Sequence, residues 1–152
     1  MKLNIGCGDK IKKGYVNLDI RKISGVDIVH DLNTALPYGN DSIDEIIAHD
    51  LLEHFSFRET HRIFKDWVRC LKIGGTIDLV VPNIEEEIQY YNDGGNIHEL
   101  SRRIYGNQNY EWNYHKRCFD SEAVLELFEQ FGITLKSIDL DKRAIHAIGV
   151  KE

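Results

Sequence analysis

Short apolar runs bounded by turn residues recur along the chain, and each is typical of a β-strand. Two longer segments instead repeat apolar residues at helical spacing. One starts at the capping-box pair Ser56 and Glu59 and continues to Gly74-Gly75, and the other runs from Asp120 or Ser121 to Gly132. Weaker helical patterns cover 84–91 and 97–104. The predicted strands are 2–5, 15–19, 27–30, 43–48, 76–82, 134–140 and 144–150.

The alternation of strands and helices predicts an α/β fold with a Rossmann-like, mixed seven-stranded sheet. The last two strands are separated only by residues 141–143, which predicts an antiparallel pair at the sheet edge. The links 6–14 and 20–26 are nine and seven residues long, too short for a crossover helix. We therefore expect a reduced helix complement around strands one to three, covered either by a second copy in a homodimer or by the segment 84–118.

Composition narrows the class of protein. A chain of 152 residues suits a single domain, 1–152, in which we expect 84–118 to be a substrate-lid insertion. No apolar run is long enough to cross a membrane, and no leader segment is recognisable, so we expect a cytoplasmic protein. The net charge of −6 disfavours nucleic acid as a partner, and the three widely spaced cysteines indicate reduced thiols.

Candidate binding residues stand where the first four strands end. Gly6-Cys7-Gly8 follows the first strand and lets the backbone approach a ligand closely. Asp19, at the end of the second strand, is placed to accept hydrogen bonds from a ribose diol. Asp31-Leu32 follows the third strand and suits an adenine amino group and ring. With Asp50 after the fourth strand, this acidic edge favours an adenosine that carries a cation such as a sulfonium and no phosphate.

These residues resemble class I S-adenosylmethionine (SAM)-dependent methyltransferases, in particular small ones with a Leu-Glu-His motif after strand four. Residues 3–9 resemble the first motif of the family, and residues 44–54 with 71–75 resemble its fourth-strand motif and following glycine turn. The resemblance implies strand order 3-2-1-4-5-7-6, SAM as cofactor, and methyl transfer by in-line displacement. Asn4 replaces an acid common in the family, and Lys10 replaces a third glycine. The implied cofactor contacts are Asn4, Gly6, Cys7, Gly8, Asp19, Asp31, Leu32 and His49.

A base helps if the acceptor is a hydroxyl or a protonated amine, and histidine has a suitable ordinary pKa. His49 is the first candidate and His54 the second. The insertion is rich in tyrosine and basic residues, which suit a sugar ring or planar group bearing an acidic substituent. We expect a small-molecule or saccharide acceptor, with Tyr114, His115 and Arg117 as contacts.

Two further interpretations stay open. The first is a non-catalytic SAM- or nucleoside-binding module, or a subunit that needs a partner. The second is an NAD-dependent oxidoreductase, which Ile11 disfavours because it stands where the dinucleotide fingerprint needs glycine. No metal site is predicted, because the spacing of His49, Glu53 and His54 fits neither HExxH nor HxxEH.

Overall fold

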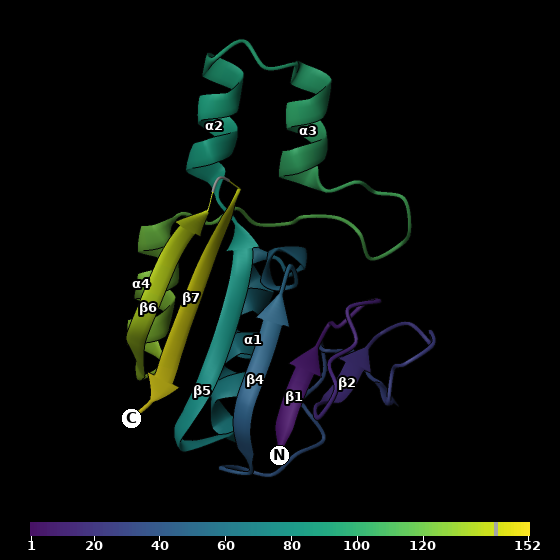
Figure 1. Ribbon diagram of the computed structural model, residues 1–152, viewed down its shortest axis with the longest axis vertical. Helices are drawn as coiled ribbons and strands as arrows, with labels where there is room; N and C mark the ends of the chain where they lie inside the picture. The colour runs from purple at the N-terminus through teal and green to yellow at the C-terminus, as the bar shows by residue number, and fades with distance from the viewer. Residues whose placement is uncertain (142) are drawn as a thin grey trace.

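The computed structural model describes residues 1–141 and 143–152 and is built on one seven-stranded sheet (Figure 1). The strand order is β3-β2-β1-β4-β5-β7-β6, as predicted. The first five strands pair in parallel, and β7 is antiparallel to both β5 and β6. Lys142, in the middle of the predicted last turn, lies outside the described residues. The strands are β1 (Lys2–Ile5), β2 (Val16–Asp19), β3 (Ile28–Val29), β4 (Ile43–His49), β5 (Leu71–Pro82), β6 (Ile133–Asp141) and β7 (Ala144–Lys151).

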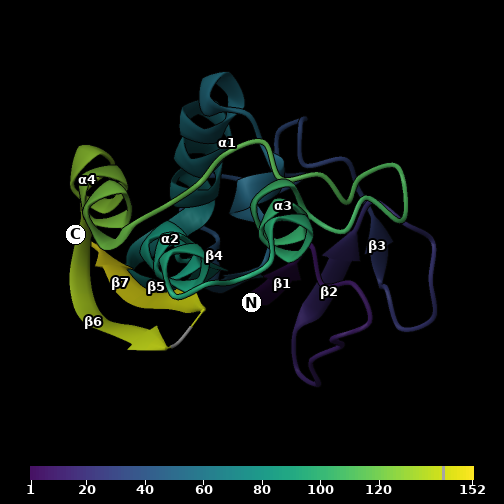
Figure 2. The ribbon, with the colours of Figure 1, turned by 90° about the horizontal axis from the view of Figure 1, so that it is seen from above.

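Helices α1 (Phe57–Cys70) and α4 (Ser121–Gln130) cover one face of the sheet (Figures 1 and 2). Between this face and the helices lies the core, where Trp67, Phe64 and Phe128 are almost fully buried. The predicted capping box starts α1, since the Ser56 N–H donates to Glu59 at 2.8 Å. Asp120 caps α4 by accepting from the Ala123 N–H at 2.8 Å.

Strand β5 begins earlier than the apolar pattern predicts. It follows α1 directly at Leu71, and the pairing with β4 then shifts, because Ile43 pairs with Leu71 whereas Glu45 pairs with Thr76. Residues 72–75 form the irregularity, and Gly74 adopts a φ of +76° there. The predicted glycine turn is therefore part of the strand, and β3 is shorter than predicted.

The opposite face of the sheet carries no helix in the described part of the chain (Figure 2). This confirms the predicted reduction in helices, since residues 6–14 and 20–26 contain none. Buried Asn4 and Asn17 hold the first short link in place. The Asn4 amide donates to the Lys10 carbonyl and to Asn17 Oδ1, each at 2.9 Å, and that oxygen also accepts from the Lys12 N–H. Hydrogen bonds of side-chain amides thus fix the path of a link that contains no helix.

The insertion rises from the carboxyl ends of the strands (Figure 1). Its helices α2 (Ile84–Asn92) and α3 (Ile97–Tyr105) form a hairpin, and residues 106–118 then run back across the strand ends (Figures 1 and 2). Arg103 joins the hairpin, with a 3.1 Å ion pair to Glu87 and its guanidinium 4.0 Å from the Tyr90 ring centroid. Among the described residues, no helix has the length and apolar character needed to span a membrane.

Candidate active site

A cavity of about 140 Å³ lies where strand ends meet the returning loop of the insertion. It is smaller than the roughly 300–1,000 Å³ typical of small-molecule pockets, so its walls must move apart to admit a ligand of nucleoside size. One wall comes from the strand ends and the loops that follow them, and the other from the insertion. The lining residues are Gly6, Asp19, Ile20, Arg21, His30, Asp31, Leu32, Asn33, Asp50, Leu51, His54, Phe55, Tyr110, Glu111, Trp112, Tyr114 and Lys116.

The glycine turn after β1 forms part of the cavity wall. Gly6 has a φ of +59°, and a Cβ placed on it would lie 2.4 Å from a methyl carbon of Leu51. The backbone conformation therefore favours glycine, and any larger residue would have to displace the Leu51 side chain. Gly8 does not itself line the cavity, but its N–H donates to Asp19 Oδ2 at 2.8 Å and so fixes the carboxylate that does.

Asp19 is buried and already bonded within the chain. Arg21 donates to its Oδ1 from both the backbone N–H and Nε, each at 2.9 Å. Burial raises the pKa of Asp19, but the bonds from Arg21 and Gly8 outweigh it and lower the pKa, so the carboxylate is ionised at neutral pH. The Arg21 guanidinium lies 4.7 Å from the Tyr110 ring centroid. Arg21 thus connects the strand-end acid Asp19 to the insertion.

Two more strand-end acids face the cavity. Asp31 is exposed and accepts from the Asn33 N–H at 2.8 Å, while the neighbouring Leu32 is buried. Asp50 pairs with Lys10 at 2.8 Å and has a φ of +51°, a left-handed conformation that costs free energy in a residue other than glycine. The acids stand at the strand ends, but Lys10 and Arg21 pair with Asp50 and Asp19.

His54 stands beside the cavity, with an ordered hydrogen bond. Its Nδ1 lies 3.0 Å from the Tyr114 carbonyl oxygen, which can only accept, so Nδ1 carries the proton. Burial lowers the pKa of His54, and contacts with backbone carbonyls offset only part of that effect. His115 packs edge-on against His54, with ring centroids 5.0 Å apart, and burial followed by the nearby His54 charge lowers its pKa too. Both imidazoles are therefore neutral at neutral pH.

Glu53, next in the chain to His54, is 1% exposed. Its Oε2 has no hydrogen-bond partner among the described residues, and burial raises its pKa to about 8. The side chain is therefore a neutral acid near pH 7. Its backbone carbonyl accepts from the N–H groups of Lys116 and Arg117, which fastens the returning loop to the short helix η1 (Leu52–His54).

Six predicted site residues do not line this cavity. Asn4 holds the first link, and Gly8 fixes Asp19. Cys7 is buried, and burial raises the pKa of its thiol to about 11, so it stays protonated. His115 and Arg117 line a separate, much smaller cavity under the insertion. His49 bonds to Asp78 on the helix-free face of the sheet.

Sequence reasoning missed Arg21, Tyr110, Trp112 and Lys116 as cavity residues. Arg21 lies two positions after a strand-end acid. This spacing allows a local ion pair and is the one sequence signal that could have identified Arg21 as a site residue. The three insertion residues belong to a segment that was recognised as aromatic and basic, but the path of the returning loop decides which of its side chains reach the cavity.

A comparison of the sequence with family profiles matches residues 15–79 to a methyltransferase domain. No curated protein matches the chain. Among solved structures, a protein from Pyrococcus horikoshii aligns with a TM-score of 0.71 at 18% identity, covering 99% of this chain and 81% of that one. A SAM-dependent methyltransferase from Methanosarcina mazei also gives a TM-score of 0.71, at 15% identity over 99% of this chain and 91% of that one.

A third similar structure is the Burkholderia thailandensis 1,6-didemethyltoxoflavin-N1-methyltransferase, solved with 1,6-didemethyltoxoflavin and S-adenosylhomocysteine bound. Its TM-score is 0.70 at 10% identity, and the alignment covers 99% of this chain and 70% of that one. At sequence identities of 10–18%, these structures are evidence for the fold alone. Their alignment over 99% of this chain shows that it shares their fold.

Proposed function

We propose that this chain is a class I SAM-dependent methyltransferase and that it methylates a small-molecule or saccharide acceptor held beneath residues 106–118. The observation that carries the proposal is a single cavity lined by strand-end carboxylates on one side and by aromatic insertion residues on the other. The first wall suits an adenosine with a positive sulfur, and the second suits a flat or ring-shaped acceptor.

The residues present fit SAM. The Cβ-free Gly6 gives close backbone approach, Asp19 would accept from the ribose hydroxyls, and Asp31 with Leu32 would contact the adenine. SAM, when bound, supplies a methyl group on a sulfonium that is open to in-line attack. Arg21 would give up a hydrogen bond to Asp19 so that the carboxylate could accept from the ribose hydroxyls. This movement of Arg21 would also enlarge the small cavity.

The insertion would hold the acceptor. Tyr110, Trp112 and Tyr114 present ring faces with polar edges, and Glu111 and Lys116 add one charge of each sign. Their task is to align the nucleophile at about 3–3.5 Å from the transferred carbon and to exclude water, the main contribution a protein can make to a displacement of this kind.

His54 is better placed than His49 to act as a base. It lines the cavity and is neutral, whereas His49 is bonded to Asp78 away from it. The fixed proton on Nδ1 leaves Nε2 as the atom that would take a proton from an acceptor hydroxyl or ammonium. His115 would position His54 by ring contact, and Tyr114 would do so through its carbonyl.

A methyl-transfer assay tests this proposal. Purified protein is incubated with methyl-labelled SAM and a panel of phenols, amines, carboxylic acids and saccharides, and the label is followed into product. Labelled product that is lost in Asp19→Asn supports the proposal. SAM binding with no product across the panel would favour the non-catalytic binding module instead.

We also infer a homodimer and a cytoplasmic location. The helix-free face alternates polar side chains with partly exposed Val80, Ile148 and Val150, which a second copy could cover, and the insertion does not lie over it (Figure 2). Sedimentation equilibrium should give twice the chain mass, and a monomer at micromolar concentration would contradict the dimer. The three free thiols suit a reducing compartment.

A further inference from the structure

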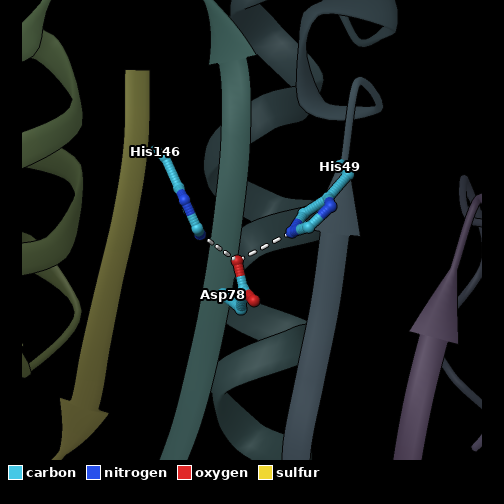
Figure 3. Close-up of side chains that lie close together, drawn as sticks. All are labelled: His49, Asp78 and His146. Atoms are coloured by element: carbon cyan, nitrogen blue, oxygen red, sulfur yellow. Dashed lines mark hydrogen bonds and ion pairs between the residues drawn. The ribbon is translucent and has the colours of Figure 1, made fainter. Parts of the chain in front are cut away.

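Three side chains from three neighbouring strands meet on the helix-free face of the sheet (Figure 3). Val80 of β5 pairs with His49 of β4 on one side and with His146 of β7 on the other. Asp78 stands two residues before Val80 and therefore points to the same face. The sheet register alone thus brings two imidazoles and a carboxylate together.

Their ligand atoms converge on one point. His49 Nε2 and His146 Nε2 each lie 2.7 Å from the same oxygen, Oδ1 of Asp78, and the three atoms lie within 4.8 Å of one another. The rings are steeply inclined, at 75° with centroids 5.7 Å apart. Figure 3 shows both rings directing a nitrogen at the carboxylate from opposite sides.

We propose that His49, Asp78 and His146 form a binding site for a divalent transition-metal ion, with Zn²⁺ as the best match. Two imidazole nitrogens and one carboxylate oxygen are a common three-ligand set for zinc, and water fills the fourth position. Nitrogen donors disfavour Mg²⁺ and Ca²⁺, which prefer oxygen. The site is separate from the methyl-transfer cavity, whose described lining includes none of the three.

The distances fit an ion after a small adjustment. Ligands about 2.0–2.1 Å from a tetrahedral zinc lie roughly 3.3 Å apart, so each imidazole nitrogen must withdraw from Asp78 Oδ1, now 2.7 Å away, by about 0.6 Å. With the ion on Nε2 of each imidazole, the remaining ring proton lies on Nδ1.

In the single chain, solvent can reach the cluster. The side chains of His49, Asp78 and His146 are 26%, 19% and 41% exposed, and no helix covers this face in the described chain. Buried Glu53 with His54 and His115 forms a second group of possible ligands. That group is a poorer site, because Glu53 stays protonated near neutral pH and His54 already bonds to the Tyr114 carbonyl.

Titration calorimetry with ZnCl₂ tests the proposal. The protein is freed of metal with a chelator and carries Cys118→Ser, because Cys118 is an exposed thiol that can bind zinc by itself. We expect one Zn²⁺ per chain, a rise in the unfolding temperature with Zn²⁺, and none with Mg²⁺. Co²⁺ in place of Zn²⁺ should give the visible absorption of a four-coordinate site without a thiolate band.

Variants locate the ion. Asp78→Asn and His146→Gln should each weaken Zn²⁺ binding by at least about tenfold to a hundredfold, the effect of losing even a residue that supports a ligand. His98→Gln, at an exposed histidine on α3, is the matched control and should bind like the parent. His146 is the most exposed of the three, so His146→Gln decides the matter if Asp78→Asn fails to fold.

Three results would overturn the proposal. One is the lack of saturable binding at one Zn²⁺ per chain. Another is unchanged affinity in His146→Gln, which would leave the cluster as a hydrogen-bonded triad. The third is loss of binding in His54→Gln but not in His146→Gln, which would move the ion to the buried group.

Discussion

Replacing Glu53 by glutamine should remove a pH-dependent loss of stability. The folded protein raises the pKa of this carboxyl from 4.5 to about 8, chiefly by burial. Because the pKa of Glu53 is higher in the folded chain than in the unfolded chain, Glu53 does not reduce the free energy of unfolding below the unfolded pKa. As the pH rises, ionisation of Glu53 lowers the free energy of unfolding, and the loss is complete above the folded pKa.

The size of the effect follows from the shift. With the pKa moved from 4.5 to about 8, the cost of ionising Glu53 is about 3 kcal/mol at pH 7 and about 5 kcal/mol above pH 9. Glutamine has nearly the same shape and no charge. Glu53→Gln should therefore match the parent at about pH 4.5 and exceed its free energy of unfolding by these amounts at higher pH.

Urea unfolding followed by tryptophan fluorescence, to which buried Trp67 contributes, measures this difference. The parent and Glu53→Gln are compared at several pH values, so other titrating groups cancel. Glu129→Gln, at an exposed glutamate on α4, is the matched control and should show no growing difference. A difference between the parent and Glu53→Gln that stays constant from acid to alkaline pH would refute the reasoning.

Three further variants test the cavity. Gly6→Ala should lower the free energy of unfolding by about 1–3 kcal/mol, through backbone strain and a clash, in urea titrations. Gly14→Ala, with a φ of +86° and open space around it, should cost less, and equal losses would contradict the packing argument. Arg21→Ala should free Asp19 and remove a positive charge, so calorimetry should show tighter binding of SAM, with a smaller gain for uncharged-sulfur S-adenosylhomocysteine. Equal gains would argue against the charge effect. His54→Gln should lower the methyl-transfer rate about 10²–10⁴-fold and abolish the decline of the parent's rate below pH 6.5, and an unchanged pH profile would exclude His54 as the base.

Most strands and both long helices could be predicted because each depends on local signals, whereas the strand order was implied by the family resemblance. Apolar runs mark the strands, and Ser56 with Glu59 marks the start of α1. The early start of β5 could not be predicted, since Leu71 belongs to the apolar stripe of the preceding helix and only pairing with Ile43 assigns it to the sheet.

The candidate site likewise contains residues that could be predicted from the sequence and residues that could not. Gly6, Asp19, Asp31 and Leu32 line one cavity because parallel strands end at a common edge, which is a property of the fold class. The role of Asn4 could not be predicted, because its amide bonds to the Lys10 carbonyl and the path of that loop is not evident from the sequence.

The cluster on the helix-free face shows the limit of spacing arguments. Asp78 and His146 are 68 positions apart, and no motif joins them. Their contact arises only from the register of an antiparallel pair, and His49 joins them across a parallel one. A search of the sequence for metal-binding motifs therefore predicts no site, whereas the sheet assembles one.

Calorimetric titration with S-adenosylhomocysteine tests the central claim, a SAM site built on the strand-end acids. We predict one molecule bound per chain and a loss of about 10- to 100-fold in affinity for Asp19→Asn, which removes charged hydrogen-bond acceptors. Asp139→Asn, at an exposed acid on β6, should leave the affinity unchanged. Absence of binding to the folded parent, or equal affinity in Asp19→Asn, would contradict the account.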